Sequence, residues 1–340
     1  MVVSGKNISK VSQRMRRGDK PINLEVSEPV RIDALDLDAQ GIARLAPSRE
    51  EQIQGQSGKV IFIQGALPTE LVTYTVTSDK ARFSKAKVRE ILKPAVFRAE
   101  PQCAAFGICG GCTMQHLDIR AQVAMKQRVL EDDLRHIAKT QAEEILRPMG
   151  GPTWGYRHRA RLSVVNRSIK KGTVLVGFHE GKSSYVADML ACEILPKHVS
   201  ILLPEMRKLI MGLSIIDRMP QIEIAVGEPE DPSSQEPNKT KPVTALVFRN
   251  LEALTAEDEQ RLRKFADQHQ VWIWLQPKGI ETVAPFYPAT GKLCYRLPEF
   301  EIEMPFKPAD FTQVNHLMNR ALVSRAIRLL EVQATDRVLD

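Results

Sequence analysis

The chain has 340 residues, of which 43% are hydrophobic, so it can form about two or three folded domains and is not globally disordered. Its 48 Lys and Arg against 41 Asp and Glu give a formal net charge of +7, which is typical of proteins that meet nucleic acid, although a merely solvated basic surface is the alternative. No apolar run approaches the roughly 20 residues of a membrane span, and no apolar segment follows the basic N-terminus, so the sequence predicts a cytoplasmic protein without a secretory signal.

The first part of the chain has the pattern of a small β-barrel. Residues 1–20 are expected to form a basic tail, and residues 21–93 contain short apolar runs separated by glycine and proline. In the run LVTYTVT, Val72 and Tyr74 alternate with threonines, as in a strand with one buried face. About five such strands favour a closed barrel of the OB type.

The last predicted strand of this barrel carries a row of cations. Its basic side chains alternate with Ala86 and Val88, so they share one face of the strand. Such a row suits a phosphate backbone, whereas the alternative is a charged edge strand that prevents aggregation. The RNA-binding candidates in the barrel are Lys80, Arg82, Lys85, Lys87 and Arg89.

A second basic stretch, WGYRHRARLS, interleaves aromatic residues with arginines. Aromatic rings can stack on bases while guanidinium groups bind phosphates, although an exposed basic strand beside a core aromatic would show the same pattern. The RNA-binding candidates here are Tyr156, Arg157, Arg159 and Arg161.

Three of the five cysteines lie within ten residues, in the stretch CAAFGICGGC. Cys103, Cys109 and Cys112 are clustered thiols in a chain expected in a reducing compartment, where metal ligation is more common than disulfide formation. Zinc and an iron–sulfur cluster both need a fourth ligand, for which Cys192 in a loop suits better than Cys294 in an apolar strand. One three-cysteine loop with one remote cysteine favours iron–sulfur over zinc, while the further alternative is that the thiols bind nothing.

The rest of the chain predicts alternating strands and helices. A helix is expected over residues 117–138, with an apolar stripe that includes Ile119, Leu130 and Ile137. The expected strands are RARLSVV, TVLVGFHE, SSYVADM, QIEIAVG, PVTALVFRN, VWIWLQP and GKLCYRL, with a flexible polar insertion at 228–242. Thr255 and Asp258 predict a capped helix, and a helix over 316–331 precedes a buried strand that begins at DRVLD.

The order of these features resembles the bacterial RNA (uracil-5-)methyltransferase family. The specific matches are the pattern CAAFGICGGC with its remote cysteine and the motif DFTQVN before a helix and RVLD. Within the family, the resemblance is to the 23S ribosomal RNA branch whose members carry a [4Fe-4S] cluster. It covers nearly the whole chain from about residue 20.

The resemblance implies an α+β multidomain protein. Residues 21–93 would form a TRAM domain, an OB-like RNA-binding barrel, and residues 94–305 a central α/β domain with the iron–sulfur loop. Residues 306–340 would begin a Rossmann-like domain that binds S-adenosylmethionine, with Gln313 contacting this cofactor. The implied ligands of the [4Fe-4S] cluster are Cys103, Cys109, Cys112 and Cys192.

The sequence departs from the family pattern in that it lacks the catalytic motifs. The family's catalytic cysteine and general-base carboxylate would lie beyond Asp340, so we expect this chain to be part of a longer protein and to be inactive alone. The implied partner is 23S ribosomal RNA, with no obligate protein partner and no membrane. The cluster is expected to be structural, with redox sensing as its alternative. Two other functions fit part of the pattern, namely a non-catalytic RNA-binding module with a structural metal site and an iron–sulfur electron carrier.

Overall fold

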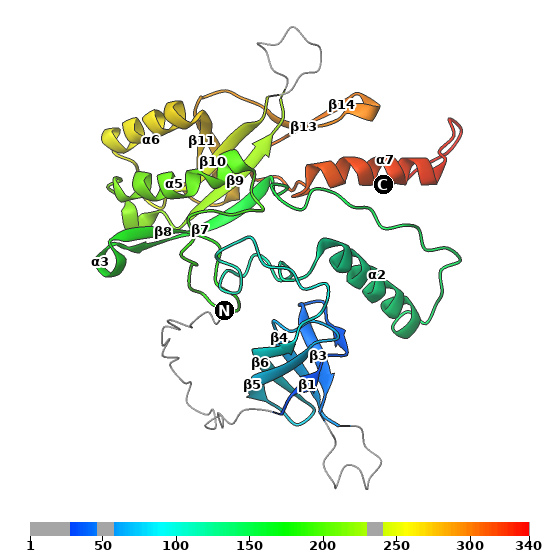
Figure 1. The fold of residues 1–340 in the computed structure, drawn as a ribbon. Coiled ribbons are helices and arrows are strands. Elements are labelled where there is room, and N and C mark those ends of the chain that lie inside the picture. The colour runs from blue at the N-terminus through cyan, green and yellow to red at the C-terminus, as the bar shows by residue number, and fades with distance from the viewer. Residues whose placement is uncertain (1–27, 46–57, 230–240, 340) are drawn as a thin grey trace. The chain divides into compact units, whose positions relative to one another are not determined.

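The computed structural model of the protein describes residues 28–45, 58–229 and 241–339 (Figure 1). The chain divides into two compact units, Met1–Arg98 and Ala99–Asp340. The expected basic tail at 1–20 and most of the expected insertion at 228–242 lie outside the described residues.

The first unit is a six-stranded sheet in the order β1-β5-β6-β4-β3-β2. Its strands are β1 Val30–Arg31, β2 Ala34–Leu35, β3 Gln40–Arg44, β4 Val60–Gln64, β5 Leu71–Asp79 and β6 Phe83–Lys93. The short segment that contains β1 and β2 closes the sheet, because β1 pairs with β5 while β2 pairs with β3. Between these two strands the backbone also bonds both neighbours of the sheet. The amide of Ile32 donates to the carbonyl of Glu70, and the amide of Asp33 donates to the carbonyl of Ile42.

The alternation expected for β5 and β6 places apolar side chains inside this closed sheet. Val72 and Tyr74 of β5 are buried together with Ala86 of β6 in one apolar cluster. The basic residues of β6 alternate with them and are exposed. The interior of the unit therefore follows directly from the period-two pattern of its sequence.

A buried ion pair fastens the end of β6 to the rest of the first unit. The carboxylate of Glu70 is fully buried and accepts hydrogen bonds from the Arg98 guanidinium at 2.6 and 2.8 Å and from the backbone amides of Leu67 and Ala95. Arg98 also donates to the carbonyl of Gly65 at 2.7 Å. Burial alone would raise the pKa of Glu70, but these donors hold its pKa below the ordinary value.

The second unit is built on a six-stranded sheet in the order β12-β11-β10-β9-β7-β8. Its strands are β7 Arg159–Arg167, β8 Thr173–Gly177, β9 Gln221–Gly227, β10 Val243–Arg249, β11 Val271–Leu275 and β12 Ala284–Tyr287. β10 and β11 are parallel, as a crossover through an intervening helix requires, and the other pairs are antiparallel.

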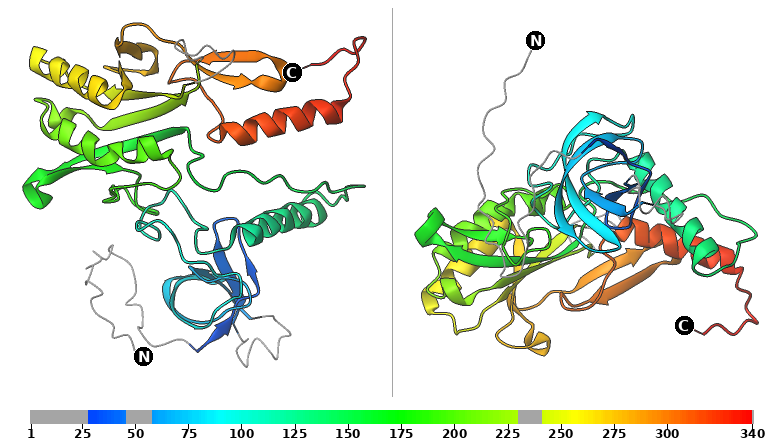
Figure 2. Two further views of the ribbon diagram at one scale, coloured as in Figure 1. Left: turned by 45° about the horizontal axis from the view of Figure 1, so that its top comes forward. Right: turned by 90° about the horizontal axis from the view of Figure 1, so that it is seen from below.

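Two helices, α5 Leu202–Met211 and α6 Ala256–His269, lie side by side on one face of this sheet (Figures 1 and 2). Their apolar side chains and those of the inner face of the sheet form the largest apolar cluster of the second unit, which includes Leu203, Met206 and Phe248. The α6 helix begins with the expected capping box, in which Thr255 and Asp258 bond each other's backbone amides. On the other face, Trp274 packs with Leu293 in a smaller cluster, which Trp272 borders.

The remaining elements are short turns, a hairpin, two long helices and two helices of four residues each. The hairpin strands β13 Leu293–Leu297 and β14 Ile302–Phe306 pair with each other, and Cys294 of β13 also accepts from the amide of Glu228, directly after β9, at 2.8 Å. The helices are α2 Ile119–His136, α3 Ser168–Lys171, α4 Lys197–Ser200 and α7 His316–Leu330, and the 3-10 turns are Ile216–Arg218, Ile280–Thr282 and Pro298–Phe300. Among the described residues, no helix is both long and apolar enough to cross a membrane.

Two expectations about secondary structure were wrong. The stretch SSYVADM is not a strand but one side of a tight loop, with a single bridge from His179 to Val186. The helix α2 forms as expected, but its apolar stripe is not buried by described residues, since Leu130 is 53% and Ile137 76% exposed. Val338 and its neighbours form no strand, because no ladder partner lies beside them in the part of the chain that the structure describes.

Candidate metal centre and cofactor-binding motif

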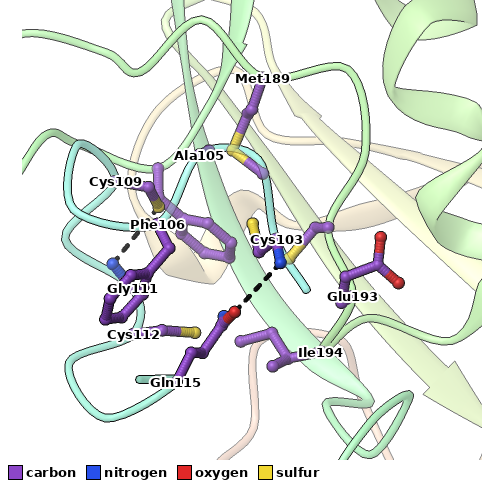
Figure 3. A pocket seen from close by; sticks show the side chains of 12 residues that line it. Cys103, Ala105, Phe106, Cys109, Gly111, Cys112, Gln115, Met189, Glu193 and Ile194 are labelled. Carbon is purple, nitrogen blue, oxygen red and sulfur yellow. Dashed lines mark hydrogen bonds between the residues drawn. The ribbon is translucent and has the colours of Figure 1, made fainter. Parts of the chain in front are cut away.

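Four cysteines from two distant segments line one pocket in the second unit. Three of them come from the loop 103–112 and the fourth follows strand β8, which is the grouping expected from the sequence. Figure 3 shows the labelled cysteines around a common space that Met189 and Ile194 also border. The four cysteines are Cys103, Cys109, Cys112 and Cys192.

The three-cysteine loop is folded by its own backbone. Phe106 donates to the carbonyl of Cys103 at 3.0 Å, and Cys109 donates to that of Ala105 at 2.9 Å. Gly107 has φ of +83°, a conformation that a residue with a side chain adopts only with strain. The side chain of Gln115 accepts from the amide of Cys103 at 3.2 Å and so ties the start of the loop to its end.

Backbone hydrogen bonds join the loop 178–187 to the cysteine loop 103–112. Gly110 donates to the carbonyl of His179 at 2.8 Å, and Gly181 donates to the carbonyl of Ile108 at 2.9 Å. A Cβ atom on Gly110 would lie 3.2 Å from both the Cα of Gly181 and the carbonyl oxygen of His179. This close backbone approach explains why a glycine stands between Cys109 and Cys112.

The fourth cysteine is fixed by the segment that leads into α4. The amide of Cys192 donates to the hydroxyl of Ser200 at 2.8 Å, and Leu195 donates to the carbonyl of Cys192 at 3.2 Å. Cys192 is 5% exposed, so it reaches the pocket from the interior side.

Two of the four thiols have a raised pKa. The pKa of Cys192 is raised to about 11, chiefly by burial and with smaller contributions from the neighbouring Cys112 and Cys103. Burial likewise raises the pKa of Cys109 above its ordinary value, again with contributions from Cys112 and Cys103. Cys109 and Cys192 are therefore protonated at neutral pH, and a metal centre that binds them must displace their protons.

The donor set fits an iron–sulfur cluster by its chemistry. Among the described residues, no three His, Cys, Asp or Glu side chains converge closely enough to hold a single metal ion. Four thiols around one pocket are compatible with a four-iron cluster, because each thiolate binds a different iron atom and the sulfurs need not meet at one point.

The fifth cysteine stands apart from this pocket. Cys294 lies in strand β13, as expected, and is 1% exposed. Burial and the neighbouring Glu303 raise the pKa of Cys294 to about 11. A buried, protonated thiol is a poor nucleophile.

The motif expected to contact S-adenosylmethionine lies just before α7. Gln313 is exposed, and the residues after it pair with the start of β7, since His158 donates to the carbonyl of Val314 at 2.8 Å and Arg157 forms a β-bridge with Asn315. Asn315 also caps α7 by accepting from the amide of Met318. The position of Gln313 is therefore set by the backbone bonds of the two residues that follow it.

The barrel candidates for RNA binding are exposed. Lys85, Lys87 and Arg89 lie on the outer face of β6, and Lys80 and Arg82 lie in the turn before it. The ammonium groups of Lys80 and Lys85 lie 5.4 and 6.0 Å from the centroid of the Phe83 ring. Phe83, which no sequence motif singles out, thus places an aromatic face among the cations.

Three of the four candidates in the central stretch, namely Tyr156, Arg157 and Arg161, contact other side chains of the protein. Tyr156 packs against the large apolar cluster, and the guanidinium of Arg157 lies 5.5 Å from the Phe178 ring. Arg161 pairs with Glu223 at 2.8 Å but remains 63% exposed. Burial lowers the pKa of Arg159 below its ordinary value, and the nearby Glu223 opposes this shift.

Several residues of the pocket carry no recognisable signal in the sequence. Phe106, Phe178 and Met189 line it as ordinary apolar residues, and the loop 178–187 contacts the cysteine loop through its backbone. The one local signal is Gly110 of the cysteine loop, because a Cβ atom there would lie 3.2 Å from the Cα of Gly181, whereas a Cβ atom on Gly181 would meet only the carbonyl oxygen of Ile108, at 4.0 Å.

Comparison with known proteins identifies the family. No protein-family model matches the chain. The chain is 86% identical over 326 residues to the 23S rRNA (uracil(1939)-C(5))-methyltransferase RlmD of Polynucleobacter necessarius, a match that covers 96% of this chain and 69% of the relative. Proteins of the same name from Burkholderia lata and Burkholderia pseudomallei are 58% and 56% identical, and the chain spans 63% and 65% of their lengths.

A solved structure shares the fold. The crystal structure of Pyrococcus abyssi tRNA (uracil-54, C5)-methyltransferase in complex with S-adenosyl-L-homocysteine matches 88% of this chain and 65% of its own, with a TM-score of 0.56 and 16% sequence identity. The mixed α/β fold is thus that of a methyltransferase relative. From the sequence matches, the chain belongs to the family of 23S rRNA (uracil-C5)-methyltransferases.

Proposed function

We propose that the protein methylates C5 of a uridine in 23S ribosomal RNA with S-adenosylmethionine as the methyl donor. The observation that carries this proposal is the 86% identity to a 23S rRNA (uracil(1939)-C(5))-methyltransferase across 96% of this chain. The exposed Gln313, held between the start of β7 and α7, supports a cofactor contact in the QVN motif.

This chain supplies RNA recognition and the metal centre. The closed sheet of the first unit acts as a TRAM-like barrel of the OB type, whose cations on β6 bind phosphates while Phe83 offers a ring to a base. The central arginines add a second RNA contact, of which Arg161 is the most exposed. The proposal also includes the division of the chain into three domains, with boundaries after residues 93 and 305.

The pocket holds a [4Fe-4S] cluster through its four cysteines. Such a centre ties the loop 103–112 to the loop after β8, and its role is structural. The convergence of the four cysteines from two distant segments on one pocket supports this ligation.

We further propose that residues 1–340 do not transfer a methyl group by themselves. C5 of uracil becomes nucleophilic when a thiolate adds to C6, after which C5 takes the methyl group from the sulfonium; a base then removes the C5 proton, the C5–C6 double bond re-forms and the thiolate leaves C6. Four of the five cysteines line the metal pocket, and Cys294 is buried. The nucleophile must therefore be a cysteine outside these five.

The test is a methylation assay with the protein produced from its complete gene. Unmodified 23S rRNA is incubated with S-adenosylmethionine, and the product is mapped by mass spectrometry of nuclease fragments. The proposal expects one methylated uridine with the complete protein and none with residues 1–340. Methylation of tRNA in preference to 23S rRNA, or no uridine methylation at all, would contradict it.

A further inference from the structure

One short segment, Gly155–His158, is bonded on one side to the loop that carries the fourth cysteine. Gly155 donates to the carbonyl of Glu193 at 2.9 Å, and Arg157 donates to the carbonyl of Ile194 at 2.8 Å. Glu193 and Ile194 directly follow Cys192 and line the cysteine pocket themselves. The backbone of this segment is thus attached to the wall of the pocket.

The same segment is bonded on its other side to the QVN motif. His158 donates to the carbonyl of Val314 at 2.8 Å, and Arg157 forms an antiparallel bridge with Asn315. These are the two residues that follow Gln313. The segment therefore lies between the cysteine pocket and the residue proposed to contact the cofactor, and it bonds both.

Side chains strengthen the connection at each end. The rings of His158 and His316 stack with their centroids 3.8 Å apart, and His316 bonds Glu228 at 3.1 Å. The pKa of His158 is lowered to about 4 by burial, and by His316 next, so its ring is neutral at pH 7. At the other end, Arg157 lies over Phe178, which lines the pocket.

We propose that filling of the cysteine pocket orders the segment Gly155–His158 and, through it, the QVN motif, so that metal loading strengthens cofactor binding without contact between the two ligands. A metal centre that binds only the ordered arrangement of the Cys192 loop stabilises that arrangement and everything bonded to it. The coupling is reciprocal, so bound cofactor must strengthen metal retention by the same factor. This inference rests on the proposed function, because it assumes that the cysteines bind metal and that Gln313 contacts S-adenosylmethionine.

The test compares metal-loaded and metal-stripped forms of the protein produced from its complete gene. Hydrogen exchange is followed by mass spectrometry for peptides that cover 155–158, 192–195 and 311–318. The affinity for S-adenosylhomocysteine is measured on both forms by calorimetry. We expect slower exchange in all three peptides on loading and an affinity gain of about fivefold or more.

One substitution weakens the connection to the QVN motif without changing a residue that lines the pocket. His158→Ala removes the stack on His316 but no pocket residue, so we expect unchanged metal content and a smaller effect of loading on exchange at 311–318. His269→Ala is the matched control, because His269 packs on Phe265 at the end of α6. It should leave the effect of loading unchanged.

Two results would overturn the inference, and they differ in what they say of the proposed function. In the first, metal binds and slows hydrogen exchange in 192–195, but exchange in 311–318 and the affinity for S-adenosylhomocysteine do not change. The proposed coupling is then wrong, while the metal site is retained. If no metal binds to the four cysteines, both the inference and the metal part of the proposed function fail.

Discussion

The imidazole rings of His158 and His316 stack at a centroid distance of 3.8 Å with an interplanar angle of 30°. The first ring stands immediately before β7 and the second in the first turn of α7, far from it along the chain. The carboxylate of Glu228 bonds His316 at 3.1 Å and Arg320 at 2.5 Å. This group of side chains attaches α7 to the sheet of the second unit.

The stability of this attachment should fall in mild acid. The pKa of His158 is lowered from 6.5 to about 4, chiefly by burial, so between these values the unfolded chain binds a proton that the folded protein does not. Unfolding free energy is therefore lost as the pH falls through this window, by at most about 3 kcal/mol. The pKa of Glu228 is also lowered, by its bond to His316, and the stability that its charge contributes is likewise lost as the pH falls.

The measurement is the unfolding free energy of the wild type and of His158→Asn between pH 7 and about pH 4. The wild type should lose stability more steeply than the variant, because asparagine does not titrate. Parallel pH profiles would contradict the assignment of this titration to His158.

Gly110→Ala should weaken metal retention without removing a ligand. The new Cβ atom would lie 3.2 Å from backbone atoms of His179 and Gly181, so the cysteine loop must move away from its support. Metal content after gel filtration should fall well below that of the wild type. Gly150→Ala is the control, since a Cβ atom on Gly150 would meet no atom within 4 Å and the metal content should not change.

Glu70→Gln should destabilise the first unit by about 3 kcal/mol, because it removes the charged acceptor of the half-buried Arg98 guanidinium at a fully buried position. The measurement is denaturant unfolding followed by hydrogen exchange in β5 and β6. Asp79→Asn is the comparison in the same unit, because Asp79 pairs with Lys59 at the surface and is 68% exposed. Its effect should be within about 1 kcal/mol, and equal effects of the two variants would contradict the role given to burial.

Replacing the row of cations on β6 should weaken RNA binding through the loss of phosphate contacts. The triple variant Lys85→Gln, Lys87→Gln and Arg89→Gln removes three exposed charges from one face. The plot of log affinity against log salt concentration should become less steep by about 2 to 3 units, because three phosphate contacts are lost.

A second triple variant controls for net charge. Lys208→Gln, Arg261→Gln and Lys264→Gln remove the same charge from exposed positions on α5 and α6. If both triple variants lower the salt slope equally, the effect follows total charge and the barrel is not the RNA-binding surface.

The sequence predicted features that depend on local patterns. The spacing of the three cysteines and the loop position of Cys192 indicated the pocket, because thiols at such positions have little other use in a reducing compartment. The alternation around Tyr74 predicted which face of β5 is buried, and Thr255 with Asp258 predicted where α6 begins.

The remaining features depend on contacts that leave no local pattern. The bonds from Gly155 to Glu193 and from His158 to Val314 join backbone groups, which every residue carries, so no side-chain signal marks them. The apolar stripe of α2 shows a second limit of prediction from sequence. A pattern around Leu130 indicates a face that can be buried, but it does not say what covers that face.

The metal content of the protein tests the central claim most directly. Anaerobic purification, followed by analysis of iron, sulfide and zinc, should give about four irons and four sulfides per chain, as a Cys₄-ligated [4Fe-4S] cluster requires. Cys192→Ser should lose most of this iron, while Cys294→Ser, at an equally buried position outside the pocket, should keep it. A colourless protein with one zinc, or equal iron in both variants, would contradict the four-cysteine cluster.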